Sequence, residues 1–271
     1  MNKNLFYIVT LIMLFRLFTA CKNKGEHPLN SDLNQAKDSF NYLPTSTTNA
    51  VINHRFYSLS YHEKYENPEW AAYTLTPSQI SRYKRKRPWF KRDPLVKTRS
   101  AGYKNYYPHG YEKGHLVPAA DRRFSKYAFN ETFLTSNVSP MSHKFNSGIW
   151  NELEKQVRYW SKHKGKLYIV TGGILSPDLP RIGYEKVAVP KYFYKIVLAN
   201  PQTSKPELIA FLIPQNYKEA DLRKYLIPVD SLEKLTGIDF FPALPDAVEN
   251  QIETIKQSGN WSFIHFKTWQ P

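Results

Sequence analysis

One histidine in this chain has neighbours that suggest chemistry. His115 lies in the block 111–122 and directly follows Gly114, a residue type that permits unusual backbone dihedrals or the close approach of another segment. A neutral imidazole titrates near neutral pH, so His115 could take a proton from water. Two further polar blocks follow at 135–140 and 145–154. Because a lone histidine is most often structural, the indication of a site comes from the three blocks together.

These three blocks, in this order and spacing, resemble the DNA/RNA non-specific endonuclease family, the ββα-metal nucleases. The family motif Asp-Arg-Gly-His reads here Glu112-Lys113-Gly114-His115. The later family motif, Asn-x-Gly-x-Trp-x-x-Leu-Glu, is matched at Asn146, Gly148, Trp150, Leu153 and Glu154. The resemblance extends from about residue 56 to residue 242. It implies an α+β protein with the ββα-metal nuclease fold, a central mixed or antiparallel sheet with helices packed on it.

The resemblance also implies roles for individual residues. His115 would be the general base, and Asn146 would hold a magnesium ion, or manganese in its place. Such an ion prefers oxygen ligands and keeps several waters, so one amide oxygen and a substrate phosphate suffice. Glu154 lies eight residues after Asn146, about 12 Å further along a helix. We therefore expect it to act through a metal-bound water, and we expect the products to carry 5′-phosphate and 3′-hydroxyl ends.

Two cationic positions complete the predicted catalytic set. Lys113 replaces the family's arginine, which keeps the charge but loses the bidentate fork for phosphate. The family has a further arginine upstream, before an aromatic residue and an aspartate. Arg87 is the nearest match, and Arg85 is an alternative. Asn137 is expected to line the site through local hydrogen bonds, whereas His54, His143 and the other histidines have no matched partners in the sequence.

Charge points to a polyanionic partner. The chain has 38 Lys and Arg against 23 Asp and Glu, a formal net charge of +15. Residues 82–104 hold one acid, Asp93, and ten basic residues: Arg82, Lys84, Arg85, Lys86, Arg87, Lys91, Arg92, Lys97, Arg99 and Lys104. Tyr83, Trp89 and Phe90 lie among them, so this stretch could bind phosphates and stack on bases. The predicted partners are DNA and RNA, although a charge run can be an ordinary solvated surface.

The N-terminus has the pattern of an export signal. Residues 1–20 combine basic residues with an apolar run too short for a comfortable membrane span, and Cys21, the only cysteine, follows directly. The pattern predicts a lipoprotein-type signal peptide over 1–20, a flexible tether over 21–50 and an endonuclease domain over 51–271. The protein would then be anchored to a bacterial envelope membrane through a lipidated Cys21. An ordinary cleaved signal, giving a secreted protein, or an uncleaved anchor is the alternative.

Strands dominate the elements expected to position these residues. Alternating or apolar runs predict strands over 55–61, 70–75, 167–171, 186–189, 192–198 and 208–214. Apolar residues at helical spacing predict a helix over 147–160 with Asn146 as its N-cap, and a second helix over 231–235 that ends near Gly237. Without regular βα alternation, the pattern favours the α+β class.

Two other functions fit parts of the sequence. A catalytically weakened nucleic-acid-binding lipoprotein would keep the basic stretch but would not respond to metal. A hydrolase of small phosphodiesters would have little use for that stretch. Cleavage of a plasmid with and without a chelator separates these possibilities from a metal-dependent endonuclease.

Overall fold

A six-stranded sheet is the centre of the computed structural model, which describes residues 40–256 and 259–265. All five neighbouring pairs of strands are antiparallel. The predicted α+β class is therefore confirmed, with an antiparallel sheet. The strands follow the order β1 (Val51–Asn53), β2 (Ser58–His62), β3 (Asn67–Leu75), β6 (Leu167–Gly173), β9 (Tyr192–Ala199) and β10 (Glu207–Pro214).

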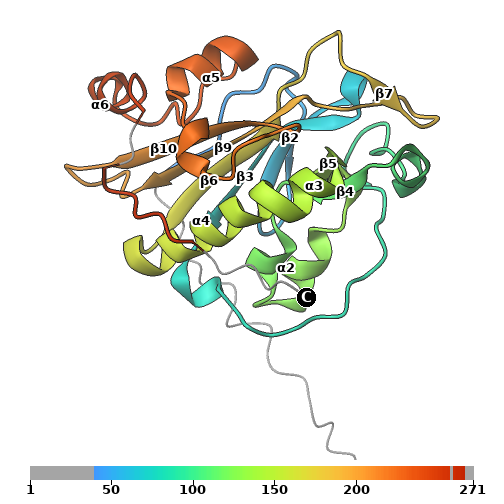
Figure 1. The fold of residues 1–271 in the computed structure, drawn as a ribbon, viewed down its shortest axis with the longest axis horizontal. Coiled ribbons are helices and arrows are strands. Elements are labelled where there is room, and N and C mark those ends of the chain that lie inside the picture. The colour runs from blue at the N-terminus through green and yellow to red at the C-terminus, as the bar shows by residue number, and fades with distance from the viewer. Residues whose placement is uncertain (1–39, 257–258, 266–271) are drawn as a thin grey trace, which may run out of the picture. The chain divides into compact units, whose positions relative to one another are not determined.

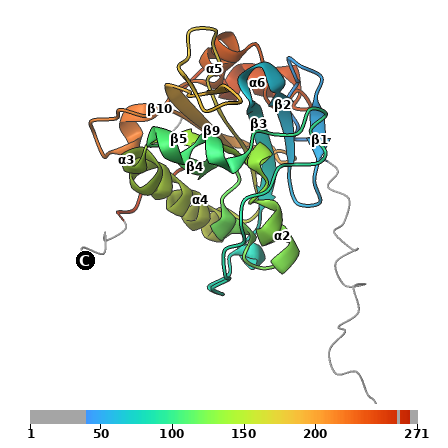
Figure 2. The ribbon, with the colours of Figure 1, turned by 90° about the vertical axis from the view of Figure 1, so that its right-hand side faces the viewer.

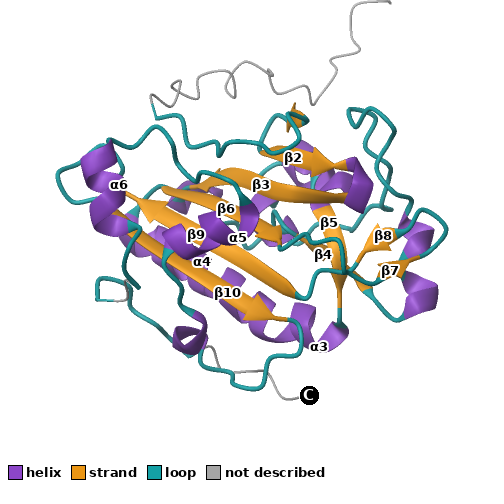
Figure 3. Ribbon diagram, turned by 90° about the horizontal axis from the view of Figure 1, so that it is seen from above, coloured by secondary structure: helices purple, strands orange, loops and turns teal. Residues whose placement is uncertain are grey.

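Helices cover both faces of this sheet, as Figures 1 and 3 show. Successive residues of a strand point to opposite faces. Ile169 therefore packs in a cluster with the helix α4 (Asn151–Lys164), and Val170 packs in a second cluster with α5 (Val229–Thr236) and α6 (Asp246–Ile252). Since both faces are buried, the central strands β6 and β9 are almost continuously apolar. The helix predicted at 231–235 corresponds to α5, which ends at Gly237 in a left-handed conformation.

The helix that carries the second motif begins earlier than predicted. It starts as α3 (His143–Phe145), where the Ser142 hydroxyl accepts a hydrogen bond from the Phe145 amide, and continues through a π-type turn over Asn146–Trp150 into α4. The assignment of Asn146 as an N-cap is wrong, because Asn146 has helical dihedrals (φ −63°, ψ −48°). The kink is at Gly148, where φ is −90° and ψ is −115°. A Cβ there would collide with the Tyr217 hydroxyl.

Two short pairs of strands lie outside the sheet, and only one of their four strands, at 187–188, falls within a predicted strand, 186–189. β4 (Glu112–His115) pairs antiparallel with β5 (Val138–Met141), and the short helix α2 (Lys126–Glu131) lies between them in sequence. β7 (Arg181–Ile182) pairs with β8 (Val187–Ala188). Within β4, a Cβ at Gly114 would collide with the Met141 side chain. The glycine before His115 therefore permits the close approach of β5.

The predicted tether is too long. Phe40 is only 6% exposed and packs edge-on against Tyr168. The amides of Thr45 and Thr47 donate to Asp239 O and Glu69 Oε1, each at 3.0 Å. Residues 40–50 thus belong to the folded domain. The rest of the predicted tether and the predicted signal peptide lie outside the described residues. Among the residues that are described, the structure contains no helix of the length and apolarity needed to cross a membrane.

Candidate active site

β4, β5 and the following helix bring the first and last sequence motifs together. His115 ends β4, opposite Val138 of β5, and the chain runs from β5 almost directly into α3 and α4. Figure 2 shows α3 and α4 beside these two strands. The side-chain nitrogen Nδ2 of Asn146 donates to Glu112 Oε2 at 2.7 Å, which joins the start of β4 to the turn before α4. The arrangement is a two-stranded ribbon followed by a helix, the ββα element.

Glu112 fixes the orientation of Asn146. Its other oxygen, Oε1, lies 2.6 Å from His143 Nδ1. Burial raises the pKa of the Glu112 carboxyl, but the hydrogen bonds from His143 and Asn146 outweigh it and the pKa is lowered. The carboxylate is therefore ionised at neutral pH, and it holds Nδ2 of Asn146. No donor in the described part of the chain contacts the amide oxygen of Asn146, which is left for another partner such as a metal ion.

Sequence reasoning had not given Glu112 or His143 a role. His143 was expected to have no matched partner, and the contact with Glu112 contradicts this. The available signal was the position of Glu112, at the acidic place of the family's four-residue motif.

The His115 ring packs against two aromatic side chains, which also contact each other. Its centroid is 5.4 Å from that of Phe90 and 5.0 Å from that of Phe133, which it meets edge-on. Its Nε2 atom is buried and has no hydrogen-bond partner among the described residues. Burial, together with the positive charges of Arg87 and Lys113, lowers the pKa of His115 to about 3. The expectation that His115 titrates near neutral pH is therefore wrong: without substrate, its imidazole is neutral throughout the physiological pH range.

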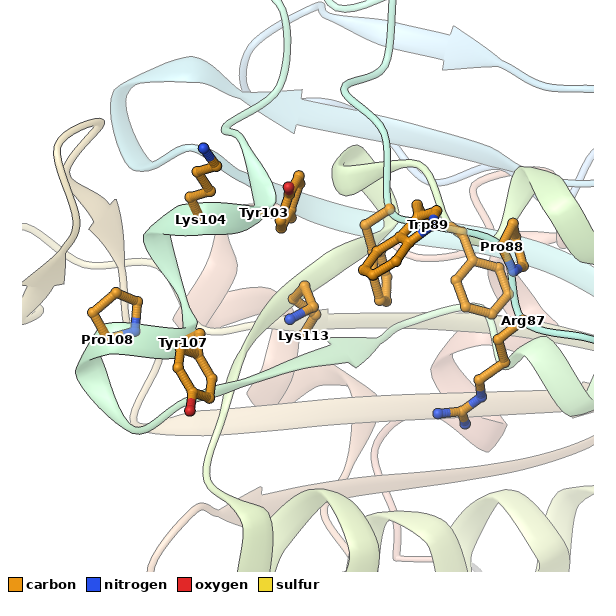
Figure 4. A pocket seen from close by; sticks show the side chains of 10 residues that line it. Arg87, Pro88, Trp89, Tyr103, Lys104, Tyr107, Pro108 and Lys113 are labelled. Carbon is orange, nitrogen blue, oxygen red and sulfur yellow. The ribbon is translucent and has the colours of Figure 1, made fainter.

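Lys113 and Arg87 line one cavity of about 620 Å³. In Figure 4, Lys113 lies between Tyr107 and Trp89, and Arg87 extends from the far side of Trp89. Trp89 and Tyr107 are 83% and 85% exposed, unusually high values for large aromatic side chains. The remaining lining residues are Pro88, Phe90, Tyr103, Lys104, Pro108 and Phe133. Cations and open aromatic faces therefore meet on one surface next to His115.

The same geometry distinguishes Arg87 from Arg85. Arg85 donates through Nε to Arg123 O at 2.7 Å and through Nη2 to Phe124 O at 3.4 Å, and its guanidinium lies over the Tyr83 ring. These contacts hold the segment 82–87 to the domain. Arg87 lines the cavity with Lys113 and acts on the charge of His115, so the geometry favours Arg87 as the upstream arginine.

A buried aspartate holds the basic segment in place. Asp93 Oδ2 lies 2.8 Å from His54 Nε2 and accepts from the Ser136 hydroxyl at 2.5 Å. The Asp93 amide donates to Ser100 Oγ at 2.7 Å. Burial acts to raise the pKa of Asp93, but the hydrogen bonds from His54 and Ser136 outweigh it, so the pKa is lowered. The expectation that His54 lacks a partner is therefore wrong; it is part of the support beneath the cationic surface.

Asn137 does not line the site; it stabilises the backbone beneath it. It is fully buried; its Oδ1 accepts from the Val117 amide at 2.9 Å, and its Nδ2 donates to Thr132 O at 3.1 Å. Its backbone oxygen accepts from the Leu116 amide at 3.0 Å. These bonds fix the backbone that follows His115.

Glu154 lies in a group of charges between α4 and the sheet. Burial raises the pKa of its carboxyl, while Arg158 and Lys195 oppose the rise. Arg158 pairs with buried Asp121 at 2.7 Å, and the Lys195 ammonium lies 4.6 Å from the centre of the Trp150 ring. In the described residues no hydrogen bond or ion pair joins Glu154 to Asn146 or Glu112. Lys195 was missed, although a lysine inside the apolar strand 192–198 was a visible signal.

Comparison with known proteins agrees with this architecture. Residues 37–247 match the family model described as DNA/RNA non-specific endonuclease. The mitochondrial nuclease EXOG of Danio rerio is 30% identical over 79% of this chain and 68% of its own length. The human EXOG is 31% identical over 81% of this chain and 64% of its own length. The mitochondrial nuclease of Saccharomyces cerevisiae is 31% identical over 68% and 63%, so the chain spans roughly two thirds of these relatives.

The predicted localisation is contradicted by the same comparisons. The relatives named above are described as mitochondrial nucleases, not as lipid-anchored proteins of a bacterial envelope. The residues on which that prediction rested, including Cys21, lie outside the described part of the structure. The signal peptide, the lipid anchor and the membrane partner are therefore unsupported.

Solved structures give the same family. The crystal structure of an EndoG/EndoGI complex, described as showing the mechanism of EndoG inhibition, contains a similar chain. The two chains superpose with a TM-score of 0.65 at 28% identity, over 75% of this chain and 89% of the chain in the complex. The fold is thus that of a ββα-metal nuclease, a class that implies a divalent metal ion. With the family model matching most of its length and a ββα element that joins His115 to Asn146, this chain belongs to the DNA/RNA non-specific endonuclease family.

Proposed function

We propose that this protein is a divalent-metal-dependent endonuclease that hydrolyses phosphodiester bonds in DNA and RNA without sequence specificity, leaving 5′-phosphate and 3′-hydroxyl ends. The observation that carries the proposal is the neutral His115 ring, whose buried Nε2 has no partner in the described residues and is acted on by two cations, Lys113 and Arg87. A buried polar atom that has no partner, beside cations in a cavity, indicates that His115 acts on the substrate.

His115 accepts the proton of the attacking water on its neutral imidazole. The water oxygen forms the new bond to phosphorus, and the bond from phosphorus to the 3′ oxygen breaks. Lys113 and Arg87 hold the phosphate and offset its charge. The phosphate in turn offsets the two cations, which raises the pKa of His115 and makes it a stronger base when substrate is bound.

Asn146 would hold the metal ion through its amide oxygen. The fit rests on the donor set: a free amide oxygen, oriented by an ionised carboxylate at 2.7 Å, suits a hard ion such as Mg²⁺ or Mn²⁺. When bound, the ion would supply positive charge for the phosphate and the leaving oxygen. Glu154 acts as a positioning residue, because its charge group with Lys195 and Arg158 holds α4, and hence the turn of Asn146, against the sheet.

The aromatic cavity would receive a base of the substrate. Trp89, Tyr103 and Tyr107 offer exposed rings beside Lys113, Lys104 and Arg87. Stacking on a ring is tolerant of sequence because every base has a π face. This supports cleavage without sequence specificity and a preference for substrates in which a base can leave the stack.

A plasmid-nicking assay tests the proposal. Wild type should convert supercoiled DNA to relaxed and linear forms and degrade RNA in Mg²⁺, and a chelator should abolish both reactions. His115→Ala should lose on the order of 10² to 10⁴ in rate while its affinity for DNA stays unchanged. The matched control is His163→Ala, since His163 is exposed on α4 and hydrogen-bonds only its own helix. Activity above a tenth of wild type in His115→Ala, or nicking that persists in chelator, would refute the assignment.

A further inference from the structure

A cluster of acids lies on the face of the sheet opposite α4, in a protein that is strongly basic overall. Asp230 is in the first turn of α5, Glu233 lies one turn later, and Glu253 follows the end of α6. One carboxylate oxygen from each of the three lies within 4.8 Å of the others. The Asp230 amide also donates to the Glu253 carbonyl at 3.4 Å, so the two helices meet here. Figure 1 shows both helices on this side of the sheet.

Glu253 is buried without a partner for its charge. The residue is only 4% exposed, and its Oε1 has no hydrogen-bond partner in the described residues. The same holds for Oε1 of neighbouring Glu249. The largest charge effects on Glu253 come from four acids: Glu233, Glu249, Asp230 and Asp239. A buried carboxylate without a partner is strongly unfavourable, so this group must either take up a proton or bind a cation.

We propose that Asp230, Glu233 and Glu253 bind a calcium ion that joins α5 to the end of α6. The ligand atoms are all oxygens, which favours a hard cation over zinc and copper, since these two prefer nitrogen and sulfur ligands. Three carboxylates that converge in a partly buried place suit Ca²⁺, which takes six to eight oxygens in flexible geometry, better than Mg²⁺, which keeps most of its waters. This site is separate from Asn146, because α4 and α5 cover opposite faces of the sheet.

Thermal unfolding of the Asn146→Ala protein tests the proposal without interference from the catalytic metal. Calcium at about a hundredfold excess over its Kd should raise the melting temperature by on the order of 5–10 °C relative to chelator. The dialysed protein should also contain one calcium ion per chain. Adding Glu253→Gln or Asp230→Asn should remove most of the calcium response. In chelator, Glu253→Gln should melt at the same or a higher temperature than its parent, because it removes a buried acid that has no partner among the described residues. The matched control is Glu219→Gln, which neutralises an exposed acid elsewhere and should leave the response intact.

Three results would overturn the calcium site. The first is an equal melting temperature in calcium and in chelator. The second is a full calcium response in both cluster variants, which would place the ion elsewhere. The third is a fall in the melting temperature of Glu253→Gln in chelator, which would mean that the carboxylate already has a partner within the chain.

Discussion

Protonation of His115 should destabilise this protein in acid, and this contribution can be measured separately from that of the carboxylates. The unfolded chain binds a proton on this imidazole below pH 6.5, whereas the folded protein holds its pKa at about 3. The sign follows from linkage: the unfolded state binds more protons between these values, so stability is fully present above pH 6.5 and is lost as the pH falls toward 3. At 1.36 kcal/mol per pKa unit, the loss is about 3 kcal/mol at pH 4 and about 4 kcal/mol at pH 3.

Denaturant unfolding of wild type and His115→Gln at pH 7 and pH 4 measures this contribution. Both proteins lose stability as carboxylates protonate, and that shared loss cancels in the comparison. The loss between pH 7 and pH 4 should be smaller by about 3 kcal/mol in the variant, which has no imidazole to protonate. NMR titration should show one imidazole, absent from the variant, that stays neutral at pH 5, and a short oligonucleotide in chelator should raise its pKa. Equal losses in the two proteins, or a His115 pKa between 6 and 7, would refute the reasoning.

Three further outcomes are expected. Asn146→Ala should need more Mg²⁺ for the same nicking rate or become inactive, with little change in stability because Asn146 does not cap the helix; a metal titration that overlays wild type would exclude it as the ligand. Replacing the exposed cations Arg82, Lys84 and Lys86 together by Ser should lower the slope of log binding constant against log salt concentration on duplex DNA by up to about 3. An unchanged slope would mean that this basic segment is an ordinary solvated surface. Trp89→Ala should weaken binding of single-stranded DNA about 5- to 150-fold, measured by fluorescence anisotropy, whereas Tyr127→Ala, an exposed ring outside the cavity, should not.

The sequence by itself determined the long strands, α5, and the existence of the helix after Phe145. Strands β3, β6, β9 and β10 carry enough consecutive apolar residues for two buried faces, and their short length and content of β-branched and aromatic residues favour a strand over a buried helix. Start and end signals were less reliable. Asn146 has the chemistry of an N-cap, but Ser142 caps the helix, because a contact between Asn146 and Glu112, 34 residues away in sequence, uses the Asn146 side chain.

Short elements were decided by tertiary contacts. β4 contains a glycine and two charged residues and β5 contains a proline, so neither has strand propensity of its own. Each forms because the other is present. The helices α2 and α6, of six and seven residues, are likewise too short to show a clear period in the sequence.

The motifs in the sequence determined which residues to examine, and only the folded structure decided how each is charged and held. His115 is desolvated by Phe90 and Phe133 and acted on by Arg87 and Lys113. Arg87 faces the cavity, while Arg85 is held by backbone carbonyls of residues 123 and 124. Burial and Coulomb interactions depend on distances between segments that are remote in sequence. Residue type and spacing can therefore name a base, a cation or a ligand, but the pKa and orientation of each are set when the chain folds.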